Sequence, residues 1–112
     1  MKLIPDKTYI DSRKLIDYLL NLTHPEGATK AQYLNEMGYN QENYHILEAD
    51  LRTQHLTRDA QPGKESNYGM KYEIVAHLVG PNGEKRLIKS VWMIRKNDTF
   101  ARLITLIPEK KL

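Results

Sequence analysis

The sequence predicts an α+β fold, with two or three N-terminal helices packed on one face of a C-terminal antiparallel β-meander of three to four strands. Apolar residues recur at helical spacing up to about residue 56, and from about residue 70 to 108 apolar and polar residues alternate between turn signals. A run of helices followed by a run of strands is typical of this class. We expect a single domain over 1–112, with helices at about 11–56, a loop at 57–69 and the β-meander at about 70–108.

The chain opens with MKLIP, which predicts a short edge strand or an ordered tail. The first helix follows in DSRKLIDYLLN, where Asp11 or Ser12 can act as N-cap and leucines recur three or four positions apart. The segment THPEG ends this helix, because Pro25 disfavours a helical His24 and Gly27 permits a sharp turn.

Two further helices and a loop complete the first half. Thr29 is the expected N-cap of the second helix, KAQYLNEM, and Gly38 is its C-terminal glycine. The third helix, NQENYHILEADLRTQHL, has Asn40 as its expected cap. The polar, turn-rich segment 57–69, TRDAQPGKESNYG, is expected to be a loop and the most mobile part of the protein.

Three strands are expected after this loop. The first, MKYEIVAHLV, alternates, so that Tyr72, Ile74, Ala76 and Leu78 share one face. GPNG predicts a hairpin turn to the second strand, KRLIKSVWMIR, and KND a short turn to the third, TFARLITLIP. The third strand is apolar on both sides, which predicts a central position with both of its faces covered.

Composition limits the function classes. With 17 Lys and Arg against 14 Asp and Glu, the net charge is +3, which favours a polyanionic partner such as RNA, DNA or an acidic protein. There is no cysteine, hence no disulfide and no thiolate metal site. No apolar run approaches the ~20 residues that span a bilayer, and the N-terminus lacks a signal-peptide core. We therefore expect a cytoplasmic protein that does not enter a membrane.

Several enzyme motifs do not occur in the sequence. It has no phosphate-binding glycine loop, no HExxH and no GxSxG, and its 4 histidines are scattered. Its carboxylates do not cluster at metal-ligand spacing either. We expect no metal and no other cofactor, which leaves a metal-independent chemistry or none.

His24 and Lys30 are the first candidate catalytic residues. Histidine exchanges a proton near neutral pH, so His24 is a candidate general acid or base; the alternative is a loop histidine that bonds locally. Lys30 stands at a helix start, where the helix dipole disfavours a cation. The same helix end attracts a phosphate, which would relieve this conflict, although a lysine there is often simply solvated.

Arg102 and Thr105 are candidates on the last strand. A charged group in such an apolar strand must reach solvent, a carboxylate or a ligand. Arg102 therefore either pairs with a glutamate or clamps a phosphate in bidentate geometry. Thr105, three residues on, points to the opposite face if the strand is regular, so the two can share a site only with a bulge or at a strand end.

The remaining candidates are one tyrosine and three residues for nucleic-acid binding. Tyr68 could transfer a proton or stack on a base, but a tyrosine that covers the core edge is the favoured alternative. Trp92 is most simply a core residue, and it would stack on a base only if exposed. Lys71 and Lys89 on the first two strands are candidate nucleic-acid contacts or part of an ordinary solvated face.

Several stretches together resemble a small uncharacterised domain family. They are YLLNLTHPEGATKAQYLNEMGY, YGMKYEIVAHLVGPNGEKRLIKSVWMI and ARLITLIP, which carry an HPxGxxKA helix start, a YGxxY strand start, a GPNG hairpin, a tryptophan strand and an RLxT terminal strand. The resemblance covers roughly residues 2–108, and it lies in the order and spacing of these motifs.

Domains of the family that this chain resembles occur alone, or at the C-termini of bacterial polymorphic toxins and of phage head morphogenesis proteins. That placement, with helices before a small antiparallel sheet, is similar to the barnase/RelE-like ribonuclease superfamily. The resemblance implies ribonuclease activity, with His24, Lys30, Trp92, Arg102 and Thr105 as the matching positions. It also implies a stand-alone toxin whose partners are RNA and a cognate antitoxin protein.

Our hypothesis from the sequence is a metal-independent endoribonuclease that leaves a 2′,3′-cyclic phosphate. His24 would be its acid or base, Lys30 and Arg102 would hold the phosphate, and Thr105 or Tyr68 would position it or share the proton transfer. The alternative is a non-enzymatic module, phage structural or regulatory, that binds nucleic acid or an acidic protein through its sheet. A third hypothesis, an antitoxin or other neutralising partner, is disfavoured by the compact pattern.

Overall fold

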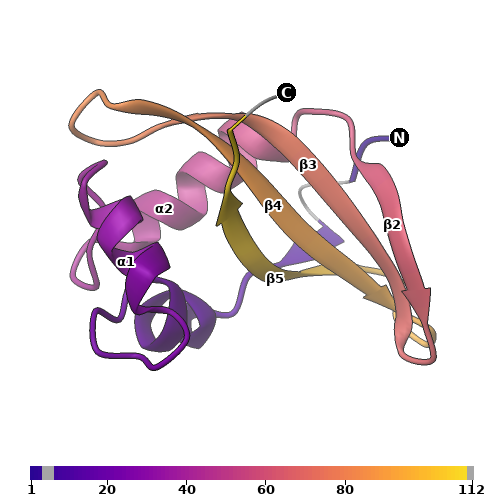
Figure 1. The fold of residues 1–112 in the computed structure, drawn as a ribbon. Coiled ribbons are helices and arrows are strands. Elements are labelled where there is room, and N and C mark those ends of the chain that lie inside the picture. Colours follow the sequence, from indigo (N-terminus) through magenta and orange to yellow (C-terminus); the bar gives the residue numbers. More distant parts are fainter. Residues whose placement is uncertain (4–6, 111–112) are drawn as a thin grey trace.

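The computed structural model describes residues 1–3 and 7–110. A five-stranded sheet has helical segments packed against it, and the strand order is β1-β5-β4-β3-β2 (Figure 1). This confirms the α+β class. Within the predicted MKLIP strand or tail, Ile4 and Pro5 lie outside the described residues, and Lys2 forms an isolated bridge with Asp59.

The helical half has the predicted order, but two segments are wound more loosely than an α-helix. The first helical segment contains the π-helical stretch η2, Lys14–Leu19, and the second is the α-helix α1, Ala28–Asn35. The third, α2, Tyr44–Asp50, continues into the π-helical η3, Leu51–His55. Single π-helical turns inside helices often accompany functional sites.

Of the predicted helix caps, Asp11 and Gly38 act as expected, whereas Asn40 bonds within the turn before its helix. Asp11 Oδ1 accepts the Arg13 amide at 3.0 Å, so Asp11 caps the first helical segment. Asn40 Oδ1 accepts the amides of Glu42 and Asn43 in the turn before α2, rather than capping the helix itself. Gly38, at φ 99°, ends α1 in the left-handed conformation that favours glycine.

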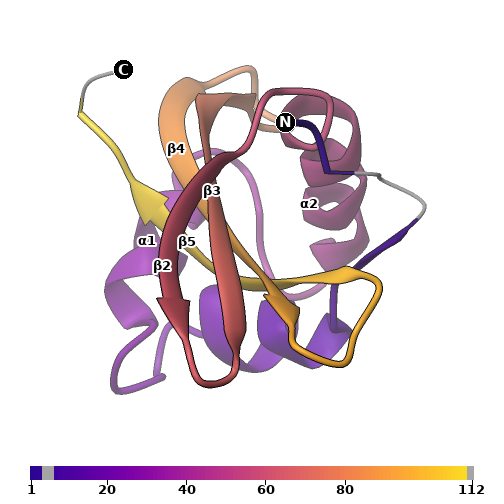
Figure 2. The ribbon, with the colours of Figure 1, turned by 90° about the vertical axis from the view of Figure 1, so that its right-hand side faces the viewer.

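Four strands form an antiparallel meander, and the last three of them were predicted individually. They are β2, Gln61–Ser66; β3, Gly69–Val79; β4, Lys85–Arg95; and β5, Ala101–Pro108. The GPNG segment turns β3 into β4, and the turn containing KND connects β4 to β5, as predicted. Figure 2 views the sheet from the end with the β2–β3 turn and shows the helical segments behind the strands; among them, η3 packs against β3.

Two strands were not predicted, and both corrections have a physical reason. The segment 57–69, predicted as a loop, contains β2, which pairs with β3 at the sheet edge. Its polar residues are almost all exposed, and an edge strand needs only backbone pairing on one side. The strand β1, Thr8–Tyr9, pairs in parallel with β5 and makes the sheet mixed. Two residues are too few to show an alternation.

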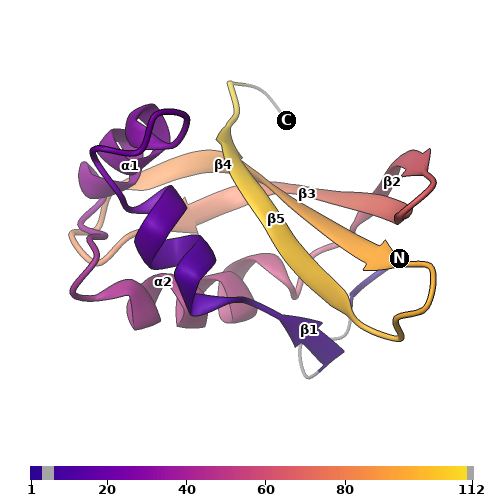
Figure 3. The ribbon, with the colours of Figure 1, turned by 90° about the horizontal axis from the view of Figure 1, so that it is seen from below.

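The last strand, β5, is not central in the sheet. It has β4 on one side, and on the other β1 pairs only with its first two residues, Ala101 and Arg102. The segments η2 and α1 pack along the remainder of β5. Figure 3 shows β5 with η2 beside it and β1 near its start. The apolar residues of β5 were predicted to indicate a central strand. They instead contact the helical segments that pack along it.

The predicted inward face of β3 is confirmed, because Ile74, Ala76 and Leu78 are buried and Tyr72 packs partly buried against the core. A polar relay lies in this core. Trp92 Nε1 donates to Ser90 Oγ at 2.9 Å, and Ser90 Oγ lies 2.8 Å from His55 Nδ1. The Nε2–H of His55 donates to the Ala76 carbonyl at 3.1 Å, since a carbonyl only accepts.

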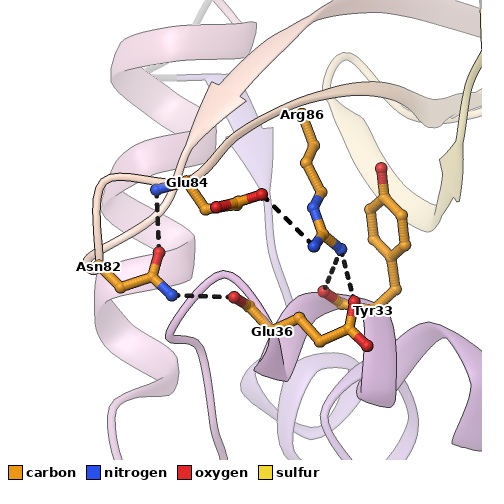
Figure 4. Close-up of polar contacts among 5 residues, drawn as sticks. All are labelled: Tyr33, Glu36, Asn82, Glu84 and Arg86. Carbon is orange, nitrogen blue, oxygen red and sulfur yellow. Dashed lines mark hydrogen bonds and ion pairs between the residues drawn. The ribbon is translucent and has the colours of Figure 1, made fainter.

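A second polar network ties the β3–β4 hairpin to the C-terminal end of α1 (Figure 4). Arg86 donates to the Glu36 carboxylate at 2.8 Å, and its guanidinium lies 4.7 Å from the centroid of the Tyr33 ring. Asn82 donates to the Glu36 carbonyl at 2.8 Å and accepts the Glu84 amide at 2.9 Å. These contacts fix the hairpin against the helix that carries Lys30.

Candidate functional site

The start of α1 is held by His24 from the preceding turn. Its Nδ1 accepts the backbone amides of Glu26 at 3.0 Å and Gly27 at 2.9 Å, so the side chain caps orphan donors ahead of the helix. The sequence predicts Thr29 as the N-cap of α1, but the N-cap is Gly27, two residues earlier. A neutral His24 in this arrangement carries its proton on Nε2. The local-bonding alternative for His24 describes what the structure shows.

Gly27 is needed because α1 approaches η2 very closely. A Cβ at position 27 would collide with the Tyr18 carbonyl oxygen and lie 2.8 Å from the Tyr18 Cδ1 atom. The His24 ring meets the Tyr18 ring edge-on, with centroids 5.1 Å apart. The HPxG motif thus brings the start of α1 onto Tyr18.

Lys30, in the first turn of α1, joins Tyr18 and Thr105 in one hydrogen-bonded cluster. Its Nζ donates to the Tyr18 hydroxyl at 2.9 Å and to Thr105 Oγ1 at 2.8 Å. The two hydroxyl oxygens are 3.2 Å apart. All three side chains are partly exposed. Since an ammonium has three N–H donors, one of them remains for a ligand. We call Tyr18, His24, Lys30 and Thr105 the Lys30 cluster.

The Lys30 cluster lowers the pKa of the Tyr18 hydroxyl. Burial alone would raise the pKa of the Tyr18 hydroxyl. Hydrogen bonds from Lys30 and Thr105 and the positive charges of Lys30 and Lys14 outweigh burial, so the pKa lies below its usual value of 10.0. The Lys14 ammonium lies 5.6 Å from the centroid of the Tyr18 ring. The Tyr18 hydroxyl therefore loses its proton more readily than that of an ordinary tyrosine.

A β-bulge in β5 decides how Arg102 and Thr105 relate. Thr105 is opposite Val91 and Arg102 is opposite Met93, with a register shift between Val91 and Trp92. Because Val91 and Met93 share one face of β4, the bulge places Arg102 and Thr105 on the same face of the sheet. They are about 10 Å apart along the strand, at 3.3 Å per residue.

Arg102 lies at the start of β5, away from the Lys30 cluster. Its Nη2 pairs with Asp98 Oδ2 at 3.0 Å, so the carboxylate partner is an aspartate of the preceding turn rather than a glutamate. No hydrogen bond or ion pair joins Arg102 to His24 or Lys30 in the described part of the chain. A hollow of about 190 Å³ lies beside Arg102, and Lys14 and Asp11 also line it.

The structure separates the other candidates from the Lys30 cluster. Trp92 is fully buried, so the exposure that stacking on a base requires is not met. Tyr68 is 76% exposed and does not cover the core edge. It lies in the β2–β3 turn, at the end of the sheet opposite α1 (Figure 1). Lys71 and Lys89 lie on the face that Arg102 shares, and Lys89 pairs with Glu73 and Glu109.

Tyr18 is the residue that sequence reasoning missed. It lies among the leucines and isoleucine of the first predicted helix, where a tyrosine is expected to belong to the buried face. The available signal was its place as first residue of YLLNLTHPEG, the first stretch of the motif series. Its contact with Thr105 joins positions 87 residues apart, which no local pattern reveals.

The described residues contain neither a cluster that could hold a metal ion nor a membrane-spanning helix. Within residues 1–3 and 7–110, no three His, Asp or Glu side chains lie close enough together to hold a metal ion. Cationic and hydroxyl groups are thus what the Lys30 cluster offers a ligand. In the same residues, no helix combines the length and apolar character needed to cross a bilayer.

Residues 4–110 match a family described as a domain of unknown function, DUF6883. The chain belongs to this family. The match agrees with the resemblance to a small uncharacterised family that the motif series indicates. No curated protein matches the sequence.

The fold is similar to a solved structure. A chain of the contact-dependent growth inhibition toxin–immunity protein complex from Klebsiella pneumoniae 342 superposes with a TM-score of 0.65 at 21% sequence identity. The match covers 89% of this chain and 98% of that chain. At this identity the similarity establishes a shared fold.

Proposed function

We propose that the protein is a toxin-like, metal-independent endoribonuclease that cleaves RNA at the Lys30 cluster. One observation carries the proposal: the Lys30 ammonium lies within 2.9 Å of a tyrosine hydroxyl whose pKa is lowered, on a partly exposed surface. Proton transfer and stabilisation of a phosphate charge are thus available at one point. The DUF6883 membership and the fold shared with a chain of a toxin–immunity complex support a toxin-like role.

In the proposed reaction, the ribose 2′-oxygen attacks the adjacent phosphorus and the bond from phosphorus to the 5′-oxygen breaks. Tyr18 acts as the phenolate, its hydroxyl proton having first gone to solvent. It accepts the proton of the 2′-hydroxyl, and the Lys30 ammonium gives a proton to the leaving 5′-oxygen. The products are a 2′,3′-cyclic phosphate and a 5′-hydroxyl. The Tyr18–Lys30 hydrogen bond of 2.9 Å then returns the proton from the tyrosine to the lysine.

The remaining residues of the cluster hold the substrate and Tyr18. The Nε2–H of His24 serves as a hydrogen-bond donor to a phosphate oxygen, and the Thr105 hydroxyl, 3.2 Å from that of Tyr18, holds the tyrosine in place. A second proton on His24 would have to go to Nδ1 and would break the two bonds to the Glu26 and Gly27 amides. His24 is therefore a positioning group and an Nε2–H donor in this mechanism, and Tyr18 replaces it as the base.

The test is cleavage of total RNA and of a defined single-stranded RNA by purified protein, with the product ends analysed for cyclic phosphate. The wild type is compared with Tyr18→Phe and Lys30→Met, and Lys64→Met serves as control, since Lys64 is exposed on β2. We expect cyclic-phosphate ends from the wild type and the control only. Intact RNA in every sample, with folded protein, would refute the ribonuclease proposal, and cleavage by Lys30→Met at the wild-type rate would refute this site.

A second candidate function is a binding module that uses the sheet face of Arg102. Lys71 is opposite Met93, which is opposite Arg102, so a lysine, a methionine and an arginine cross three adjacent strands on one face. Such a row of basic and apolar side chains suits an acidic protein or nucleic acid. If this function holds, Lys71→Met lowers affinity for the partner while Tyr18→Phe has no effect. Equal binding by Lys71→Met and the wild type would count against it.

A further inference from the structure

A hollow of about 460 Å³ lies at the start of β5, and the proposed reaction does not use it. Residues from β1 and from the turn before β5 line it together: Lys7, Thr8, Tyr9, Thr99, Phe100 and Arg102. Its volume is within the range of small-ligand sites, about 300–1,000 Å³. It combines two aromatic rings with two cationic side chains.

Arg102 places a positive charge beside the two aromatic rings of this hollow. Its guanidinium carbon lies 5.0 Å from the centroid of the Phe100 ring and 5.9 Å from that of Tyr9. Its Nε–H is buried without a hydrogen-bond partner among the described residues, although Nη2 pairs with Asp98. The side chain as a whole is 24% exposed, and a guanidinium carries five N–H donors, so donors other than the buried Nε–H and the Nη2–H bonded to Asp98 are available to a ligand. Tyr9 is 46% exposed, which leaves ring surface available for contact.

Shared lining residues relate this hollow to the surroundings of the Lys30 cluster. Tyr9 and Arg102 line both this hollow and the smaller one of about 190 Å³, and Lys14 lines the smaller one. Lys14 in turn lies against the Tyr18 ring. The cations Lys30, Lys14 and Arg102 thus follow one another, with Asp11 in the lining of the smaller hollow and Asp98 paired to Arg102. Asp11 is itself paired to Arg13, and cations in series can contact a phosphate backbone.

We propose that the hollow of Tyr9, Phe100 and Arg102 binds an unpaired nucleobase of the RNA strand whose scissile phosphate lies at Lys30. This inference rests on the proposed function and names its substrate class, single-stranded RNA. Aromatic rings stack on any base, and an arginine beside them adds a cation–π contact and a donor for a base or phosphate oxygen. A base held in a duplex cannot enter such a hollow, so the site selects unpaired regions.

The experiment uses a short single-stranded RNA with 2′-O-methyl groups throughout, which cannot be cleaved because the reaction needs a free 2′-hydroxyl. A set of these probes lacks the base at one position each, and affinity is measured by fluorescence anisotropy. The wild type should lose about tenfold in affinity at one position and little elsewhere. Phe100→Leu and Tyr9→Leu should bind the complete probe more weakly and lose the sensitivity to that missing base.

Loss of sensitivity at one position is a coupling between ring and base, which a general loss of stability does not produce. Circular dichroism and thermal unfolding identify variants that fold, and either of the two variants suffices. Equal sensitivity to the missing base in wild type and folded variants would overturn the inference, as would no position-specific loss in the wild type.

Failure of this inference can be told apart from failure of the proposed function by the cleavage of unmodified RNA. Cleavage by a wild type whose binding ignores the missing base would overturn the nucleobase site and leave the ribonuclease proposal standing. Binding that depends on Phe100 and on one base, without any cleavage, would support the nucleobase site as a binding site and refute the enzymatic proposal.

Discussion

Acid should destabilise the protein through the buried His55, and the size of the effect follows from the structure. His55 is fully buried, and both of its ring nitrogens are hydrogen-bonded as the neutral form requires. Burial, with a smaller contribution from the charge of Arg58, lowers its pKa from 6.5 to about 4, although the bond to the Ala76 carbonyl opposes this. The folded state thus binds a proton less readily than the unfolded state.

The sign and the pH window follow from these two values. Stability from the neutral ring is present above pH 6.5 and is lost as the pH falls from 6.5 towards about 4. At about 1.36 kcal/mol per pKa unit the complete loss is about 3 kcal/mol. About 2 kcal/mol of it should be lost between pH 7 and pH 5. This is a large share of the stability of a small domain, about 5–15 kcal/mol.

The assay is urea unfolding at pH 7 and pH 5, followed by the fluorescence of the single tryptophan, Trp92. His55→Gln supplies an acceptor and a donor that do not titrate, and His77→Gln removes an exposed histidine as a control. We expect the wild type and His77→Gln to lose about 2 kcal/mol more than His55→Gln between the two pH values. The reasoning is refuted if His55→Gln loses as much free energy of unfolding as the wild type. The carboxylates that both proteins contain would then explain the whole pH dependence.

Three further predictions concern the geometry around Lys30. Tyr18→Phe should lower the cleavage rate about 10²- to 10⁴-fold and abolish a rise of rate with pH below 10.0, whereas Tyr68→Phe should not; equal rates for both variants would remove Tyr18 from the mechanism. Gly27→Ala should lower the free energy of unfolding by about 1–3 kcal/mol, because its Cβ collides with Tyr18, and chemical denaturation would show it; unchanged stability would contradict this contact. Arg86→Met should lower the melting temperature more than Arg13→Met, because Arg86 also contacts Tyr33 whereas Arg13 pairs with Asp11 on an exposed surface; calorimetry that ranks them the other way would contradict this role for the hairpin network.

The lysine and the threonine of the Lys30 cluster were predicted as candidates, but not their contact. Lys30 conflicts with the helix dipole, and Thr105 belongs to a terminal strand motif, so both could be selected from local features. Arg102 was selected correctly as a charge in need of a partner, and its partner proved to be Asp98. Tyr18 could not be separated from a core tyrosine, because its importance comes from the helix and the strand that meet it.

The sequence by itself determined the order of helices and strands, the two turns of the meander, the inward face of β3 and the glycine that ends α1. These features depend on residues a few positions apart, which side-chain periodicity and backbone preferences control. Tertiary structure decided the pairing of β1 and β2, the bulge in β5 and the meeting of Tyr18 with Thr105. Each joins distant segments or shifts a strand register, and a change of one residue in register moves a side chain to the other face of the sheet.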